Sequence, residues 1–447
     1  MDDIQDLTKG SISKHIVSLS LPTSVGFFFH TMYNVVDTYF AGKISTDALA
    51  ALSVSFPLFF LIIAATSGTQ SGVAAIVSNY LGAGDKEQAI KYSGQSLSFT
   101  LFISFFITAL GLLVSEPAFI ALGASGEYLQ LSLDYMNVLF LGSFLFIFAG
   151  VLNALLTASG DTKPYRNFLI TGFFLNLILD PWFVYGGYGV PAMGVQGVAI
   201  ATVLIQALGC LYMFKKAQAT GLLCKNCFKE FFPNLHCYKE LSYQSFPAAL
   251  NMLTVSLGYF VLTYFISIFG QEAVAGFGIA TRIEQIALLP CIGFNMAVLA
   301  IVGQNSGAGE LQRAEQSWLT AIRYAVTVLV PGILLVLFYS KEAMGLFSSD
   351  ELVISHGVQY LKIAAFAFWA YAILYISIFA LQGLKRPIFG LVLGVFRQVI
   401  FPYILISFLI EKLDWGIFGV WWGFFIVTWA ACFFTLWYTK KTFSKSL

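Results

Sequence analysis

Charged side chains are scarce in this chain of 447 residues, where aspartate, glutamate, lysine and arginine together make up only 11%. Soluble domains carry roughly 25%. Hydrophobic residues reach 58%, and the mean hydropathy is +0.80. A chain of this length and hydropathy excludes one large soluble core and predicts many membrane spans.

Histidine and cysteine are also few, with four of the first and six of the second. An intramembrane enzyme needs a nucleophile with a base, or histidine and aspartate at metal-binding spacing. The histidines are too scattered for either arrangement: His15, His30, His236 and His356. A C-x-x-C at Cys224 and Cys227 raises zinc, but the adjacent His236 and Cys237 suit a tetrahedral site poorly. We therefore predict no enzyme, no bound metal on this loop, and free thiols.

Long apolar runs fill the rest of the sequence. Runs of about 20 residues recur twelve times, centred near residues 28, 63, 103, 143, 175, 205, 255, 288, 327, 367, 399 and 428. They are too long and too continuously apolar for the strands of a barrel. The fold class predicted is an all-α membrane protein of twelve transmembrane helices. The opening "MDDIQDLTKGSISKHI" carries acids and lacks a small-residue cleavage site, so we expect no removable signal peptide.

Basic residues are distributed unevenly along the chain. With twelve spans, 18 of the 24 lysines and arginines fall on the side of the termini, 3 on the other side and 3 within spans. The side rich in lysine and arginine is the cytoplasmic one. Both termini are therefore expected in the cytoplasm. A net charge of +1 gives no indication of nucleic acid, and we expect no such partner.

The second half of the chain repeats the first. "VSNYLGAGDKEQA" at 77–89 matches "VGQNSGAGELQRA" at 302–314 without a gap, and the same offset carries Pro22 onto Pro247. Each half has six spans, so both halves start on one side of the membrane and the symmetry axis lies along the membrane normal. We predict two six-helix lobes with pseudo-two-fold symmetry, at 1–215 and 240–447, joined by a cytoplasmic loop at 216–239. This architecture favours a transporter, and a duplicated scaffold or receptor is the alternative.

Polar residues break the symmetry between the halves. Asp37 falls on Leu262 in the second half, and Asn176 and Asp180 likewise have no acid or amide counterpart. A carboxylate at bilayer depth costs about 2.5 to 3.5 kcal/mol, and it is retained where it pairs or binds a proton or cation. The polar set therefore points to function in the first half.

Spacing places these groups on shared helix faces. Asn176 and Asp180 are four residues apart, as are Tyr33 and Asp37. Pro181 lacks an N–H and is expected to disrupt its helix, freeing a carbonyl as a further ligand. Two acids, an amide and free carbonyls suit a hard cation or a shared proton. The alternative is a pair of acids satisfied by neighbouring groups for helix packing alone.

A proline precedes the first acid in its helix. Pro22 lies fifteen residues before Asp37, about 22 Å along an ideal helix. Proline weakens a membrane helix, so a helix bend at Pro22 is expected when the charge of Asp37 changes. Pro247 repeats it in the half without the acid, which leaves a packing role equally open.

The order of short motifs resembles a known family. "LPTSV", "YNVVDTYFAG", "LGAGD", "ASGDTKP", "NLILDP" and "LQGLKRP" together resemble the multidrug and toxic compound extrusion (MATE) transporters, and their first-half acids resemble the DinF-like branch. The resemblance implies a monomeric antiporter of the bacterial inner membrane that exports cationic, lipophilic drugs in exchange for protons or sodium ions, with no cofactor. It implies cation coupling at Asp37, Asn176, Asp180 and Thr202, with the first three as metal ligands if the ion is sodium. It implies a substrate cavity at Tyr33, Tyr135 and Asn153.

A lipid-linked precursor flippase of the same superfamily is the nearest rival. Such a protein needs several arginines for pyrophosphate, whereas the predicted spans offer as bases only Arg282, Lys362 and Arg397. Arg282 and Glu284 lie two residues apart on different helix faces, and no role is assigned to either. The motifs do not choose between proton and sodium, nor do they name the physiological substrate.

Overall fold

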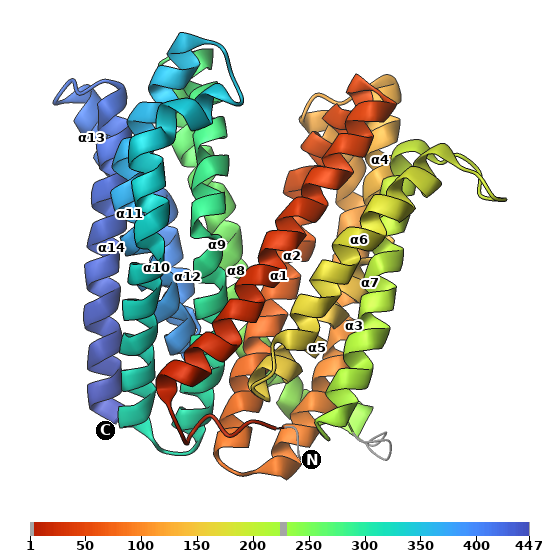
Figure 1. The fold of residues 1–447 in the computed structure, drawn as a ribbon, viewed down its shortest axis with the longest axis vertical. Helices are drawn as coiled ribbons and strands as arrows, with labels where there is room; N and C mark the ends of the chain where they lie inside the picture. Colours follow the sequence, from red (N-terminus) through yellow and green to blue (C-terminus); the bar gives the residue numbers. More distant parts are fainter. Residues whose placement is uncertain (1–3, 224–229, 447) are drawn as a thin grey trace. The chain divides into compact units, whose positions relative to one another are not determined.

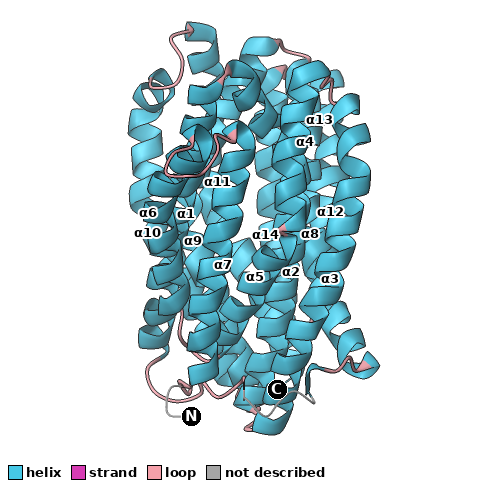
Figure 2. Cartoon of the chain, turned by 90° about the vertical axis from the view of Figure 1, so that its right-hand side faces the viewer, coloured by secondary structure: helices cyan, strands magenta, loops and turns pink. Residues whose placement is uncertain are grey.

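The computed structural model describes residues 4–223 and 230–446, and these are almost entirely helical (Figures 1 and 2). Within that part of the chain the strand-like pairing is a single isolated bridge between Gly187 and Val190. The all-α fold class is confirmed. Cys224 and Cys227, which raised the question of zinc, lie outside the described residues.

Backbone contacts divide the chain into two compact units. The first unit comprises Met1–Asp6 and Val25–Ala249, and the second comprises Leu7–Ser24 and Leu250–Leu447. Two long helices therefore each belong partly to both units, namely α1 (Ile12–Ile44) and α8 (Leu235–Ser267). The lobe boundaries expected at residues 215 and 240 remain a prediction.

The first unit contains the C-terminal part of α1, the N-terminal part of α8 and the helices between them. These are α2 (Thr46–Gly82), α3 (Lys86–Ala121), α4 (Gly126–Leu141), α5 (Ser143–Ala158), α6 (Lys163–Tyr185) and α7 (Gly194–Ala219). Polar caps start two of them, because Ser45 accepts from the N–H of Ala48 and Asp85 from that of Gln88.

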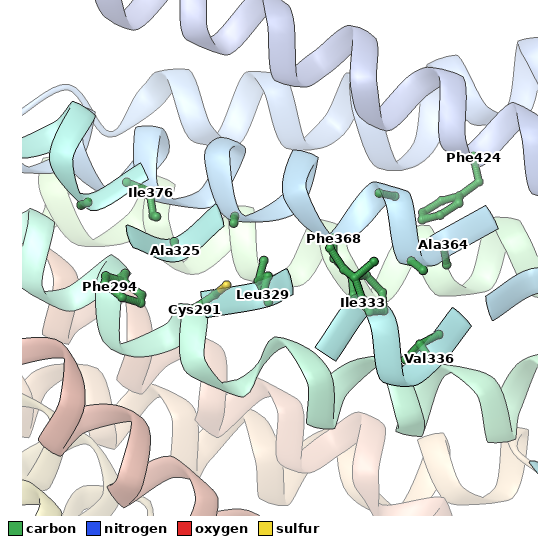
Figure 3. Packing of buried hydrophobic residues seen from close by; sticks show 14 of the residues in the cluster. Cys291, Phe294, Ala325, Leu329, Ile333, Val336, Ala364, Phe368, Ile376 and Phe424 are labelled. Carbon is green, nitrogen blue, oxygen red and sulfur yellow. The ribbon is translucent and has the colours of Figure 1, made fainter. Parts of the chain in front are cut away.

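The second unit contains the remaining parts of α1 and α8 and every later element. These are α9 (Gln271–Gly307), α10 (Leu311–Gly345), α11 (Glu351–Gly383), α12 (Ile388–Val395), the π-helix η2 (Phe396–Ile400), α13 (Phe401–Glu411) and α14 (Ile417–Ser446). Buried apolar side chains from α9, α10, α11 and α14 form its core, among them Phe294, Leu329, Phe368 and Phe424 (Figure 3).

The helices account for the twelve predicted spans. Ten of the described helices, with α12 to α13 taken as one, are long and apolar enough to cross a membrane, and the bent pair α4 and α5 makes an eleventh. The remaining long helix is α1, which carries several hydroxyl side chains together with one amide, Asn34, and one acid, Asp37. The predicted span near residue 143 is a broken helix, and the one near residue 399 is a continuous helix that contains a π-helical turn.

A glycine and a hydrogen bond from a neighbouring helix explain the break between α4 and α5. The two helices meet at Gly142 with a bend of 44°. A Cβ at Gly142 would collide with Val203 of α7. The hydroxyl of Thr108 on α3 donates to the carbonyl oxygen of Phe140, 2.8 Å away. The missing side chain of Gly142 thus leaves room for α7, and α3 provides the hydrogen bond that the bend requires.

The sequence repeat reappears as a repeated helix contact. Gly68 of α2 lies against Ser245 and Ala249 of α8, where a Cβ would collide with both. The counterpart of Gly68 is Gly293 of α9, which lies in the same way against Ser20 and Ser24 of α1. Each contact lies within one unit. The close packing of small residues explains why the start of α1 belongs to the second unit and the start of α8 to the first.

Candidate functional site

Three buried polar side chains meet within the first unit. Asp37 of α1 is 6% exposed, and Asn176 and Asp180 of α6 are fully buried. The amide nitrogen of Asn176 donates to Oδ1 of Asp37 at 2.9 Å and to Oδ1 of Asp180 at 2.8 Å. Asn176 therefore connects the two acids through hydrogen bonds.

The shared donor holds the two carboxyl groups close together. Both accepting oxygens lie within hydrogen-bond length of one nitrogen, so they are at most about 6 Å apart. Two negative charges at that separation, buried among apolar helices, repel strongly. A proton or a cation bound between Asp37 and Asp180 would remove that repulsion.

Further oxygens of this cluster lack a partner. Among the described residues, Oδ1 of Asn176 and Oδ2 of Asp180 are buried and accept no hydrogen bond. Buried polar atoms are normally satisfied, so each exception requires an explanation. Carboxylate and amide oxygens are the ligands that hard cations prefer. The set fits a sodium ion or a proton, and within the described chain no group of three or more His, Cys, Asp or Glu side chains suggests another metal site.

Pro181 does not interrupt its helix. The sequence predicted a disruption there, but α6 continues through Pro181 to Tyr185. The predicted disruption of the helix is wrong, because a membrane helix tolerates proline where neighbouring groups satisfy its backbone. The missing N–H still leaves the carbonyl of Leu177, four residues earlier, without its helical donor.

Tyrosine and threonine side chains surround the acids. Tyr33, one turn before Asp37 on α1, donates from its hydroxyl to Oγ1 of Thr202 on α7 at 3.0 Å. Both residues are buried. Tyr135 of α4 lies close enough to interact electrostatically with both acids. The structure therefore gathers Tyr33, Tyr135 and Thr202 around the carboxyl pair, with Thr202 bonded to a tyrosine.

Two predicted residues stand outside this network. Asn153 of α5 is buried, and its side-chain oxygen accepts from the hydroxyl of Thr157 on the same helix, at 3.3 Å. Pro22 lies in the part of α1 that belongs to the second unit, within a helix assigned as continuous from Ile12 to Ile44. Neither residue touches the acids in the described structure, and their roles stay predictions.

A second polar cluster, in the second unit, carries residues to which the sequence assigned no role. Glu284 of α9 is buried and accepts from the hydroxyl of Tyr360 at 2.6 Å, whereas Arg282 is exposed. Arg397 of η2 is buried, and its nitrogen Nη2 donates to the hydroxyl of Tyr375 at 3.2 Å. A basic residue inside a predicted span was the available signal for Arg397.

Comparison with known proteins decides the family. A family model described as MatE matches the chain twice, at residues 22–182 and 247–406. The chain belongs to the MatE family. The two MatE matches begin at Pro22 and Pro247, the pair that the internal repeat relates, so they confirm the repeat. Together they cover well over half of the chain.

Relatives in the MatE family are named as transporters. A FAD transporter of Shewanella oneidensis is 29% identical over 405 residues, covering 90% of this chain and 88% of its own length. A probable multidrug resistance protein NorM of Thermotoga maritima is 27% identical and covers 77% and 74%. The expectation of a transporter and not an enzyme is confirmed by the MatE family.

Solved structures of the MatE family share the fold over their whole length. An outward-facing multidrug resistance MATE family transporter of the MOP superfamily has a TM-score of 0.92 and 26% identity, covering 100% of this chain and 99% of the other. A MOP superfamily transporter from Pyrococcus furiosus, described as having a binding pocket of reverse polarity, has the same TM-score at 25% identity and the same coverage.

Proposed function

We propose that this protein is a secondary active exporter of the bacterial inner membrane that exchanges organic compounds for inward-moving protons or sodium ions. Family membership supports efflux transport in general, and the coupling reaction is inferred from the first unit. Lipophilic cationic drugs are the proposed cargo, in keeping with relatives named as multidrug resistance proteins.

One observation carries the coupling proposal, namely that a single amide, Asn176, bridges the buried acids Asp37 and Asp180. The two carboxyl groups lie close enough to share a hydrogen bond, and Oδ1 of Asn176 accepts nothing among the described residues. In our proposal these oxygens receive the coupling ion. Sodium would be held by Asp37, Asn176 and Asp180, and a proton would be shared between the two carboxyl groups.

Ion binding acts on transport through α1, because this helix carries Asp37 and Tyr33. When the ion neutralises the carboxyl pair, the attraction of the first unit for a cationic cargo falls. A ligand shifts a conformational equilibrium only by its different affinity for the two states. Competition between ion and cargo for the first unit therefore couples their movements in opposite directions.

A transport assay in vesicles tests the proposal. Purified protein is reconstituted, and a proton gradient and a sodium gradient are imposed separately while a fluorescent lipophilic cation is followed. We expect one gradient to drive uptake against the cation gradient, and Asp37→Asn to abolish it. Ion-driven transport by Asp37→Asn at the wild-type rate would refute coupling at Asp37.

A second candidate cargo is an aromatic anion. The first relative is named a FAD transporter, and FAD carries phosphates on an aromatic compound. Buried Arg397, beside tyrosines in the second unit, is the observation that favours this class. The flippase alternative is less favoured, because two of the three bases in the predicted spans, Arg282 and Lys362, are exposed and do not form an arginine-lined site.

A further inference from the structure

Arg397 lies on the short π-helix η2 between α12 and α13. Pro402, five residues later, has no N–H to donate. The N–H of Phe401 instead reaches back five residues to the carbonyl oxygen of Phe396. This wider turn places the side chain of Arg397 inside the second unit, where it is 5% exposed. Single π-helical turns within α-helices are frequent at functional sites.

Aromatic side chains of α11 enclose the guanidinium group. Its central carbon lies 5.6 Å from the ring centre of Tyr371 and 5.6 Å from that of Tyr375. These two rings are stacked on each other, with centres 6.1 Å apart. Ring faces attract the cation but do not neutralise it.

No carboxylate pairs with Arg397 in the part of the chain that the structure describes. Its side-chain hydrogen bonds go to the neutral hydroxyls of Tyr375 and Tyr371. The buried acid nearby, Glu284, is instead bonded to Tyr360. Arginine keeps its charge at any physiological pH, so the second unit holds a buried positive charge with no negative partner.

Close packing fixes η2 against α8. A Cβ at Gly394 would collide with Asn251 and Thr254, and one at Gly258 would collide with Gln398, the neighbour of Arg397. The backbone of α12, one turn before Arg397, and the side chain of Gln398 therefore pack against α8. A guanidinium held on such a rigid support is well placed to bind a planar, two-oxygen anion.

A planar ring also finds contact surface beside the guanidinium. Tyr371 and Tyr375 are half-buried, and Tyr259 of α8, which lies near enough to Arg397 for the two to interact, is 37% exposed. Aromatic rings pack favourably on tyrosine in stacked or edge-on arrangements. Charge and ring surface thus occur together in the same cluster.

We propose that the second unit contains an anion-recognition site in which Arg397 binds the phosphate or carboxylate of a planar aromatic cargo and Tyr259, Tyr371 and Tyr375 contact its ring. This inference rests on the proposed export function and develops its second candidate cargo, the aromatic anion. It assigns the two polar clusters different tasks, with the ion bound in the first unit and the cargo's anionic group in the second.

Equilibrium binding of two matched fluorescent probes tests the site. Flavin mononucleotide and riboflavin share one ring system and differ by a phosphate, and each is titrated with purified full-length protein in a non-ionic detergent. We expect the phosphate to strengthen binding roughly tenfold, the gain typical of a charge-assisted arginine contact. Equal affinities for the wild-type protein would overturn the proposal without any variant.

Substitutions locate the effect. Arg397→Gln should reduce the preference for flavin mononucleotide to less than about twofold while riboflavin affinity stays unchanged, because the tyrosine rings remain. Arg282→Gln, an exposed arginine of the same unit, should retain the full preference. A preference that survives in Arg397→Gln, or disappears equally in Arg282→Gln, would contradict the assignment.

If Arg397→Gln does not purify as a single species, Tyr375→Phe, which removes a hydroxyl bonded to Arg397, should still lower the preference severalfold. An unaltered preference would count against the site.

A lipid headgroup is the other source of an anion that could bind Arg397. The titrations are therefore repeated in nanodiscs of phosphatidylcholine and of phosphatidylglycerol. A preference retained in both supports a cargo site, and a preference abolished only by phosphatidylglycerol assigns Arg397 to lipid and overturns the cargo class. Since no ion gradient is imposed, failure of the coupling proposal would leave these outcomes readable.

Discussion

At the scale of single residues, the amide of Asn176 determines how the candidate ion site is built. Both hydrogens of one nitrogen are used on two carboxyl groups from different helices, α1 and α6. A carboxylate in that place would add repulsion, and an apolar residue would leave both acids without their donor. The amide therefore keeps two acids together while leaving oxygens available for an ion.

Replacing Asn176 should destabilise the protein. Asn176→Leu leaves two buried carboxyl oxygens without a donor, and each lost partner costs about 1 to 3 kcal/mol. We expect a clear fall in melting temperature in detergent. The matched substitution Asn167→Leu, at an exposed position of the same helix, should leave the melting temperature nearly unchanged. Equal melting temperatures for the two variants would show that the bridge contributes little.

Replacing Asp37 should separate folding from transport. Asp37→Asn has nearly the same shape and can still occupy the site, but it carries no charge for the ion to neutralise. We expect normal expression and insertion with loss of active drug export from cells. Asp134→Asn is the control, since Asp134 accepts an exposed hydrogen bond from Gln130 on α4. Drug resistance equal to wild type for Asp37→Asn at matched expression would contradict the assignment.

Sequence spacing predicted the acid network better than it predicted the second cluster. Four-residue spacing on a helix fixes a shared face, so Asn176 and Asp180 were expected together. Arg397 and Glu284 gave no such signal, because their surroundings depend on which tyrosines of α11 the tertiary fold brings to them. The π-helical turn that aims Arg397 inward likewise depends on packing against α8 as much as on Pro402.

At the scale of elements, α1 and α8 are the helices that the two units divide. The division in α1 falls between Ser24 and Val25, two residues after Pro22. The division in α8 falls between Ala249 and Leu250, two residues after Pro247. In each helix the missing proline N–H weakens the hydrogen bonding close to the point where the contacts change from one unit to the other.

Substituting the prolines should reveal whether α1 bends in transport. Pro22→Ala restores a backbone donor and stiffens α1, so we expect slower ion-driven export with folding preserved. Pro247→Ala is the matched variant in a helix with Leu262 in place of the acid, and it should reduce export less. Transport rates in vesicles at equal protein amounts provide the comparison. Equal losses in the two variants would favour a packing role for both prolines.

The internal repeat predicted most helices, but it did not predict where a helix is broken. The offset between the halves, which holds through the first two spans of each, gave their matching helices and the corresponding turns, in which Gly84 and Gly309 have positive φ angles of 74° and 77°. The bend at Gly142 was not visible in the apolar run, because it depends on Val203 of α7 and Thr108 of α3. Hydropathy shows that a segment can span a membrane, and tertiary contacts decide whether its helix is continuous.

At the scale of the whole molecule, the uneven distribution of lysine and arginine predicts how the chain lies in its membrane. The helix order of the structure places the end of α14 and the loop between α10 and α11 at opposite ends of the helices, because three helix passes separate them. The terminal side carries 18 basic residues against 3 on the other. The positive-inside rule then predicts a cytoplasmic C-terminus and an external loop at residues 346–350.

Labelling with a membrane-impermeant maleimide tests that orientation. The labelling starts from a variant with Cys224→Ser and Cys227→Ser, and the four cysteines of the described chain, which remain, are buried. Ser349→Cys, exposed between α10 and α11, should react in intact cells, and Ser444→Cys, exposed near the end of α14, should react only after the cells are permeabilised. Reaction of both after permeabilisation shows that each thiol is accessible. The reverse labelling pattern would mean that the chain lies in the membrane with its termini outside. Inward-moving ions could then no longer drive export by the proposed exchange.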